Sequence, residues 1–258
     1  MGADLGLKAM AITDHDTVVG IKDGRKAAAR YDIRFFPGIE ISTQKGEEIH
    51  ILGYNIDEDS PKLIRSCEQY EKDRLGRGER ICDFFNRRDI PMMLDEVKTI
   101  AGEGSLGRPH FAAWLMEKGY VSDRRVAFSK YLDTKEFHEE TDRIKPTPEF
   151  AIELIHKAGG RAVLAHPGLL KMSEGNQEIL IRDLTEAGLD GIEAFYNRHK
   201  TKQTNLYIDF ARRFDLKLSC GSDFHGEKVK PDVKLGMVLN YDFLNKLVVN
   251  LAGEPCNL

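Results

Sequence analysis

The sequence has few of the residues that cross-link small proteins. Its four cysteines are Cys67, Cys82, Cys220 and Cys256, and none shows the C-x-x-C spacing of a thiolate metal site. Neither a disulfide framework nor a thiolate zinc site is indicated, so we expect reduced cysteines without a chemical role. A chain of 258 residues can bury roughly 70–75% of its extended surface, which makes cross-links unnecessary for folding.

Long apolar runs and an excess of basic residues are also missing. No apolar run approaches the roughly 18 residues of a membrane span, and residues 1–10 lack the basic and apolar regions of a signal peptide. The chain carries 38 Lys and Arg against 42 Asp and Glu, a net charge of −4. This balance argues against tight, non-specific binding to duplex nucleic acid such as DNA, with a local basic groove as the alternative. From the missing span and signal-peptide regions we expect a cytoplasmic protein that binds no membrane.

Short apolar runs flanked by breaking residues alternate with helical stretches. The helix expected at residues 148–158 has Thr147 as its N-cap and Pro148 in its first turn. Such an alternation predicts a parallel α/β architecture, whose commonest closed form is a barrel. The expected strands are residues 8–13, 35–42, 48–54, 161–165, 191–195 and 216–220, and the expected helices are 19–31, 148–158, 177–187 and 201–214.

The middle of the chain departs from this alternation. Residues 61–145 carry helix signals and no convincing strand. We interpret residues 67–145 as an inserted helical lobe, and residues 1–66 and 146–258 as the barrel.

Side chains that bind metals stand at the ends of several expected strands. The carboxyl ends of strands in a parallel α/β barrel meet at one mouth, so these side chains are expected to converge there. Imidazoles and carboxylates without thiolates favour Zn, Mn or Fe, and one carboxylate can bridge two ions. The candidate ligands are His15, Glu40, His50, His166, Asp223 and His225.

Each candidate also has an interpretation without metal. His50 alone fits a hydrogen-bonded residue at the barrel rim, and His15 between two aspartates fits a salt-bridged surface turn. For His166 the sequence favours the metal interpretation, because Pro167 is expected to hold His166 in extended geometry and so to fix the direction of its side chain. Asp223 and His225 are two residues apart, which points both side chains the same way in an extended chain, but an Asx-type turn would contain the same residues.

Candidates for substrate binding lie mainly in the lobe. Arg77 falls on the apolar stripe of the helix that begins at Pro61, where a buried guanidinium needs an anion such as phosphate. The alternative is that Gly76 and Gly78 break this helix and turn the arginine to solvent. Arg108 and His110 are stronger candidates for phosphate binding, with a helix cap as the alternative.

His199 follows an expected strand in the segment Tyr-Asn-Arg-His. It is a candidate for substrate contact or for protonating a leaving group. The catalytic candidates are therefore His199, Arg108 and His110, and the phosphate-binding candidates are Arg77, Arg108 and His110.

Six motifs resemble, in order, those of the PHP (polymerase and histidinol phosphatase) family, and in particular its bacterial nucleoside 3',5'-bisphosphate phosphatases. They are Ala-Ile-Thr-Asp-His-Asp-Thr (11–17), Pro-Gly-Ile-Glu-Ile-Ser (37–42), His-Ile-Leu-Gly-Tyr (50–54), Gly-Arg-Pro-His-Phe-Ala (107–112), Val-Leu-Ala-His-Pro (163–167) and Gly-Ser-Asp-Phe-His (221–225). The resemblance implies a distorted (β/α)7 barrel with an inserted lobe, and up to three ions such as Mn, Zn or Fe. It implies that the six candidate ligands hold these ions.

The family pattern also includes a first strand with a His-x-His motif, and this sequence has no counterpart of that strand or of the helix after it. The resemblance therefore implies one or two metal sites here. A barrel without one strand exposes its edges, which favours self-association.

The resemblance predicts a metal-dependent phosphoesterase that uses a metal-bound hydroxide. Its expected substrate is a phosphomonoester of a small nucleotide, similar to a nucleoside 3',5'-bisphosphate, or a short oligonucleotide. One alternative is a catalytically impaired PHP-like binding domain, because the first ligand motif is missing. Another is a barrel hydrolase of the amidohydrolase type, but we find no strand suited to a carbamylated lysine.

Overall fold

The computed structural model describes residues 1–102, 104–227, 229–230 and 232–237. Within them, the contacts divide the chain into two compact units. The first unit comprises Met1–Ser66, Lys145–Phe224 and the segment from Val233, and the second comprises Cys67–Ile144 and His225–Asp232. Cys256 and the end of the expected barrel, residues 238–258, lie outside the described residues.

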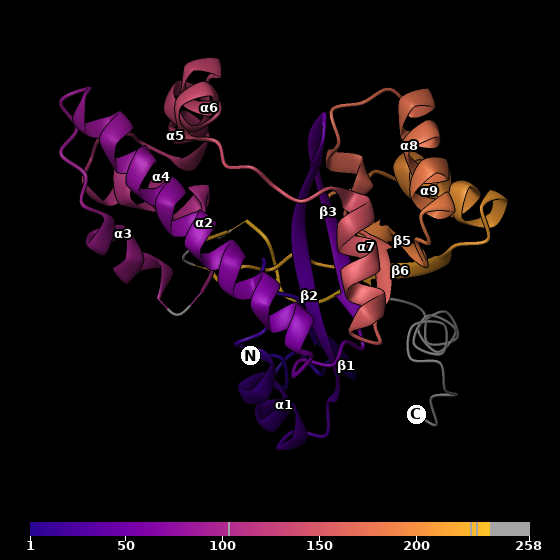
Figure 1. Cartoon of the computed structure of the whole chain (residues 1–258). Helices are drawn as coiled ribbons and strands as arrows, with labels where there is room; N and C mark the ends of the chain where they lie inside the picture. The colour runs from indigo at the N-terminus through magenta and orange to yellow at the C-terminus, as the bar shows by residue number, and fades with distance from the viewer. Residues whose placement is uncertain (103, 228, 231, 238–258) are drawn as a thin grey trace. The chain divides into compact units, whose positions relative to one another are not determined.

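The first unit contains a curled mixed sheet of six strands in the described part of the chain, in the order β1-β2-β3-β4-β5-β6 (Figure 1). The strands are β1 (Ala9–Ile12), β2 (Arg34–Lys45), β3 (Glu47–Tyr54), β4 (Arg161–Leu164), β5 (Gly191–Tyr196) and β6 (Lys217–Gly221). The helices of this unit are α1 (Ile21–Ala29), α7 (Pro148–Lys157), α8 (Glu174–Glu186) and α9 (Thr201–Arg213), with a short 3-10 turn, η2, at Pro167–Leu169. The mixed α/β class predicted from the sequence is confirmed.

The prediction of a parallel sheet was wrong for β3. The pairs β1·β2, β4·β5 and β5·β6 are parallel, but β3 runs antiparallel to both β2 and β4. Only Gly46, with φ of 76°, separates β2 from β3, and so tight a turn can join only antiparallel neighbours. The expected strands 35–42 and 48–54 thus form one long hairpin.

Apolar side chains on both sides of the sheet form the core of the first unit. Helix α7 contacts β2, β3 and β4, and α9 contacts β5 and β6. Ile39, Ile41 and Ile51 of the hairpin are fully buried, as are Ile152 and Ile155 of α7. Thr147 caps α7 as predicted, because its side chain accepts a hydrogen bond from the Phe150 N–H. The strands thus position polar side chains both within them, such as Glu40 and His50, and just beyond their ends, such as His166.

The second unit is helical in its described residues, as the sequence predicted for this part of the chain. Its apolar core includes Phe84, Phe85, Phe111, Trp114 and Phe137. The elements are α2 (Pro61–Asn86, which begins in the first unit), α3 (Leu94–Ala101), α4 (Arg108–Glu117), α5 (Arg124–Ala127), a π-helical turn η1 (Phe128–Leu132) and α6 (Lys135–Thr141).

The unit boundaries differ from the predicted ones at two points. Lys145 belongs to the first unit, because its ammonium group lies 2.9 Å from Glu48 Oε1. The segment His225–Asp232 belongs to the second unit, where the Val229 carbonyl accepts a hydrogen bond from Arg124. The sequence could not predict these points because both depend on contacts between segments far apart along the chain.

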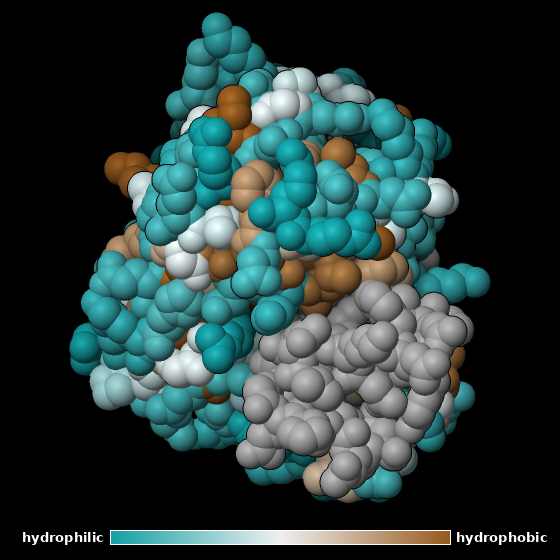
Figure 2. All heavy atoms as spheres, turned by 90° about the vertical axis from the view of Figure 1, so that its right-hand side faces the viewer, coloured by the Kyte–Doolittle hydropathy of each residue, from teal (hydrophilic) through white to brown (hydrophobic). Residues whose placement is uncertain are grey.

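Hydrophilic residues predominate among the coloured atoms on the face drawn in Figure 2, with hydrophobic residues in scattered patches. Within the described residues, no helix combines the length and the apolar character that crossing a bilayer requires.

Candidate metal centre

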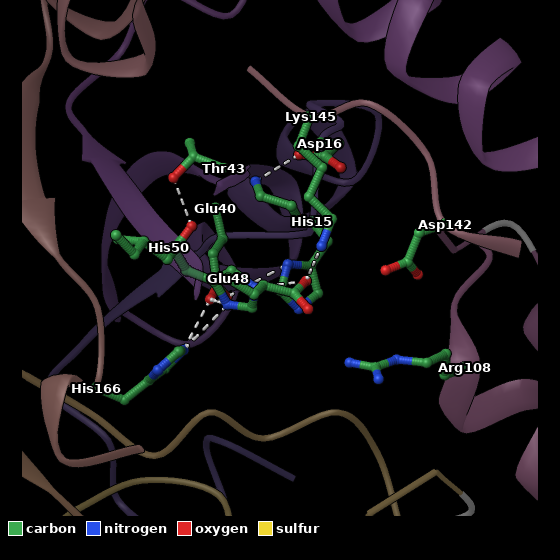
Figure 3. Close-up of polar contacts among 12 residues, drawn as sticks. His15, Asp16, Glu40, Thr43, Glu48, His50, Arg108, Asp142, Lys145 and His166 are labelled. Atoms are coloured by element: carbon green, nitrogen blue, oxygen red, sulfur yellow. Dashed lines mark hydrogen bonds and ion pairs between the residues drawn. The ribbon is translucent and has the colours of Figure 1, made fainter. Parts of the chain in front are cut away.

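Glu40 lies at the centre of a cluster of imidazoles in the first unit (Figure 3). Its carboxylate is 5% exposed and stands on β2, opposite Leu52 of β3. Oε1 lies 2.7 Å from His50 Nδ1 and 2.9 Å from His166 Nε2, while Oε2 lies 3.8 Å from His15 Nδ1. The two oxygens of one carboxylate therefore face different imidazoles.

The potential ligand atoms form two groups that share Glu40. Those of His15, Glu40 and His50 lie within 4.8 Å of one another, and so do those of Glu40, His166 and Asp223. Nitrogen and carboxylate oxygen donors at such spacing suit Zn, Mn or Fe, and a carboxylate common to both groups is suited to bridging two ions. The donor set therefore fits divalent metal ions.

Local backbone structure brings His15 to this cluster. The residues before and after it are bonded to β2, since Glu40 N–H donates to the Asp14 carbonyl and Asp16 N–H donates to the Glu40 carbonyl. Asp16 is 2% exposed, and its carboxylate accepts a hydrogen bond of 2.8 Å from the Ser42 N–H. The salt-bridged surface turn considered for His15 is therefore not what the structure shows.

The carboxylate of Glu40 and the imidazoles beside it stabilise each other's charged forms. Burial opposes ionisation of Glu40, but His15, His50 and His166 together hold the pKa of its carboxyl well below the usual range. Burial also opposes charge on His50, yet Glu40 and Glu48 raise the pKa of His50 to about 9. With a pKa of about 9, His50 is an imidazolium at neutral pH.

Two expectations about backbone geometry were wrong. His166 is not extended before Pro167 but has φ of 26° and ψ of 57°. Asp223 has φ of 53°, so the chain from Asp223 to His225 is not extended either. The side chain of Asp223 is also bonded outside its own segment, since the Tyr196 hydroxyl donates to Asp223 Oδ2 at 3.1 Å.

The structure brings together five of the six predicted ligands: His15, Glu40, His50, His166 and Asp223. The sixth, His225, is grouped with the second unit. There it contributes, after burial, to lowering the pKa of His110. Its role as a metal ligand stays a prediction.

The predicted phosphate-binding residues lie in the second unit, each with a partner. Helix α2 is continuous through Gly76 and Gly78, so the interpretation in which these glycines break the helix was wrong. The Arg77 side chain is 12% exposed and lies 2.7 Å from Asp142 Oδ1. Arg108 lies 2.6 Å from Asp133 Oδ1, and His110 Nδ1 caps α4 by accepting a hydrogen bond from the Gly107 N–H.

His199 bonds to the backbone through both ring nitrogens. Nδ1 donates to the Ala194 carbonyl at 3.0 Å, and Nε2 accepts from the Gly168 N–H at 3.1 Å. These two bonds require a neutral ring with its proton on Nδ1. The predicted role as a proton donor stays a prediction.

Glu193 is a buried acid beside this cluster that the sequence analysis did not single out. It is 3% exposed, and its Oε2 accepts a hydrogen bond of 2.7 Å from the His166 N–H. Burial raises the pKa of Glu193 to about 7. A signal was present, because Glu193 interrupts the otherwise apolar strand Gly-Ile-Glu-Ala-Phe. Burial likewise raises the pKa of the Cys220 thiol, to about 12.

Comparisons with known proteins agree with a hydrolytic metal site. No family model matches the sequence. The chain is 35% identical over 221 residues to a 5'-3' exoribonuclease of Haemophilus influenzae, covering 85% of this chain and 80% of the relative. It is 34% identical over 218 residues to a 3',5'-nucleoside bisphosphate phosphatase of Chromobacterium violaceum, covering 84% and 76%.

A solved structure agrees with these relatives. A protein of Bifidobacterium adolescentis, provisionally named a metal-dependent phosphoesterase, matches with a TM-score of 0.83 at 27% identity, covering 98% of this chain and 90% of that one. These proteins are all similar to this chain, and their names describe hydrolases of phosphate esters. The chain belongs to the PHP family of phosphoesterases.

Proposed function

We propose that this protein removes phosphate from a small nucleotide, similar to a nucleoside 3',5'-bisphosphate, or trims a short oligonucleotide. The observation that carries the proposal is the buried carboxylate of Glu40, which is shared by two groups of potential metal ligands. The printed names of the relatives, an exoribonuclease and a bisphosphate phosphatase, support a nucleotide substrate. The (β/α)7 form of the barrel and the choice among Mn, Zn and Fe stay predictions.

The residues of the chain have separate tasks in this proposal. His15, Glu40, His50, His166 and Asp223 would hold one or two ions, with His225 as a further candidate. Bound divalent ions supply Lewis-acid chemistry, since they activate water and neutralise charge on a phosphoryl group. The carboxylate of Glu40 holds the rings of His50 and His166 beside it, which would place both imidazoles at the site that the ions would occupy.

Arg77, Arg108 and His110 would bind the phosphate in this proposal. The two guanidinium groups already contact carboxylates, Asp142 and Asp133, in the absence of substrate. A phosphate offers oxygens of the same charge and similar spacing, so it can compete with these carboxylates for the arginines.

Removal of a ligand tests the metal site directly. We expect His166→Ala and Asp223→Ala each to reduce the amount of metal bound per chain. Phosphate release from a panel of nucleoside bisphosphates should fall by about 10² to 10⁴-fold, because the ions supply several kcal/mol of transition-state stabilisation. Metal content is measured by mass spectrometry after dialysis, and His156→Ala, which removes an imidazole partnered with Asp190, is the control. Full metal content in both variants would contradict the proposal. Metal binding by the unaltered protein without phosphate release from any substrate would favour the binding-domain alternative.

Removal of a guanidinium tests the phosphate site. We expect Arg108→Met to raise KM by about 10 to 100-fold, because a hydrogen bond to a charged group contributes about 1.5–3 kcal/mol. Metal content should not change. Arg87→Met is the control, since Arg87 lies in the same unit and also pairs with a carboxylate, Glu140. An unchanged KM in Arg108→Met would remove this residue from the substrate site.

A further inference from the structure

The backbone of His166 has a conformation that a residue with a side chain rarely adopts. Its φ of 26° and ψ of 57° lie in the left-handed region, and the residue is not a glycine. The same backbone directs the imidazole so that Nε2 lies 2.9 Å from Glu40 Oε1. Such a conformation persists only where its surroundings hold it in place.

Three side chains hold the segment that begins at His166. Glu193 accepts a hydrogen bond from the His166 N–H, and His199 accepts one from the Gly168 N–H. The amide of Gln203 donates to the Gly168 carbonyl at 3.2 Å, while its oxygen accepts from the Lys200 N–H. All three side chains come from β5, α9 or the turn that joins them.

The neighbouring glycines show how closely these side chains fit. A Cβ at Gly168 would lie 2.6 Å from the His199 ring and 2.7 Å from Gln203 Nε2. A Cβ at Gly221 would overlap Glu193 Oε1. Glycine at both positions therefore leaves room for the side chains that hold the His166 segment.

We infer that Glu193 is a positioning residue, which fixes the left-handed backbone of His166 and thereby directs its imidazole toward the metal centre. His199, in the turn before α9, and Gln203 of α9 support the same segment. Glu193 acts through the His166 N–H and is not itself counted among the ligands. The inference rests on the proposed function in one respect: it takes His166 to be a metal ligand. It assigns His199 a task that differs from proton donation.

Two substitutions separate the hydrogen bond from the charge of Glu193. Glu193→Leu fills a similar volume but offers no acceptor, and Glu193→Gln keeps a carbonyl oxygen without the charge. We expect Leu to lower the affinity for Mn²⁺ by about 10 to 100-fold, the usual effect of losing a residue that orients a ligand, and Gln to recover most of that loss. Affinity is measured by calorimetric titration. Gln177→Leu is the control, because it removes a different buried hydrogen bond, from Tyr207, in the same unit.

Two readouts do not depend on metal. The melting temperature of metal-free Glu193→Leu should fall, since the His166 N–H loses its acceptor, and should recover in Glu193→Gln. Hydrogen exchange of the His166 amide should be slow in the unaltered protein and in Glu193→Gln, and fast in Glu193→Leu. If the unaltered protein binds no Mn²⁺, the proposed function fails, while the amide exchange still decides whether Glu193 holds His166.

Two results would overturn the inference. One is unchanged amide exchange together with unchanged Mn²⁺ affinity in Glu193→Leu. The other is an equal loss of affinity in the Gln and Leu variants, which would mean that the charge matters and the hydrogen bond does not.

The role of His199 is tested with two kinds of substrate. If His199 positions the segment, His199→Leu should lower turnover of an aryl phosphate and of a nucleotide phosphomonoester by the same factor. A proton donor matters most for a poor leaving group. A loss confined to the nucleotide would therefore restore His199 as a catalytic residue and overturn this part of the inference.

Discussion

Glu40→Gln is expected to lower phosphate release on the order of 10³-fold, and to leave the protein almost without bound metal after dialysis. Glu40 belongs to both groups of potential ligands, and its two oxygens face different imidazoles. Glutamine keeps the shape, but it removes the charge and turns an NH₂ group toward one of the imidazoles. One substitution should therefore affect both parts of the centre.

The control for Glu40→Gln is Glu178→Gln. Glu178 lies on α8 and pairs at the surface with Arg213, so this variant removes the same charge at a distance from the centre. Its metal content and turnover should equal those of the unaltered protein. If Glu40→Gln keeps its full complement of metal and its turnover, Glu40 does not bridge ions and the proposed centre is wrong.

The affinity for metal is expected to rise steeply with pH in the neutral and mildly alkaline range. The pKa of His50 is raised to about 9 in the metal-free protein, because the nearby carboxylates of Glu40 and Glu48 outweigh the effect of burial. His50 is therefore protonated at pH 7, and a ring nitrogen must lose its proton to bind a cation. Below about pH 9 the affinity should rise about tenfold per pH unit through this group alone.

The carboxylate of Glu40 adds nothing to this slope. Its pKa lies well below the usual range, so Glu40 is ionised throughout the window. Proton release is measured by calorimetric titration of metal into the protein in buffers that differ in ionisation enthalpy. Close to one proton per His50 site should be released at pH 7, and the number should fall toward zero as the pH rises through about 9.

A conservative variant checks the origin of this proton. Glu48 Oε1 lies 3.3 Å from His50 Nε2, and it is one of the groups that raise the pKa of His50. In Glu48→Gln the pKa of His50 should fall, so proton release should end at a lower pH. An affinity that does not vary with pH in the unaltered protein would show that His50 is already neutral or does not bind the metal.

Sequence patterns predicted the elements more reliably than the way they pair. The apolar runs identify each strand to within a few residues, because a buried strand needs an unbroken apolar stretch whatever its partner is. Strand direction was predicted wrongly for β3. The sequence around Gly46 does indicate antiparallel pairing, since it leaves room only for a tight turn. The alternation of strands and helices in the rest of the chain led to the prediction of a parallel sheet instead.

The structure gathers five of the six predicted ligands, while their role in binding metal stays a prediction. His166 follows the end of β4, as the strand-end argument expected, but Glu40 lies within β2 and not at its end. Glu193 escaped prediction because it looks like one more residue of a strand until its hydrogen bond to the His166 N–H is seen. The continuity of α2 through two glycines was likewise decided by packing, since Gly78 faces Leu94 and Leu106 where a Cβ would not fit.

The sequence by itself determined the class of the fold, the helical character of the lobe and the chemistry of the side chains available to bind metal. The tertiary structure decided which of them meet, how β3 is oriented, and that His166 and Asp223 adopt left-handed backbones. The reason is physical. Apolar periodicity and residue chemistry are properties of a short segment, whereas the geometry of His166 depends on Glu193, 27 residues further along the chain, and on Glu40, 126 residues before it.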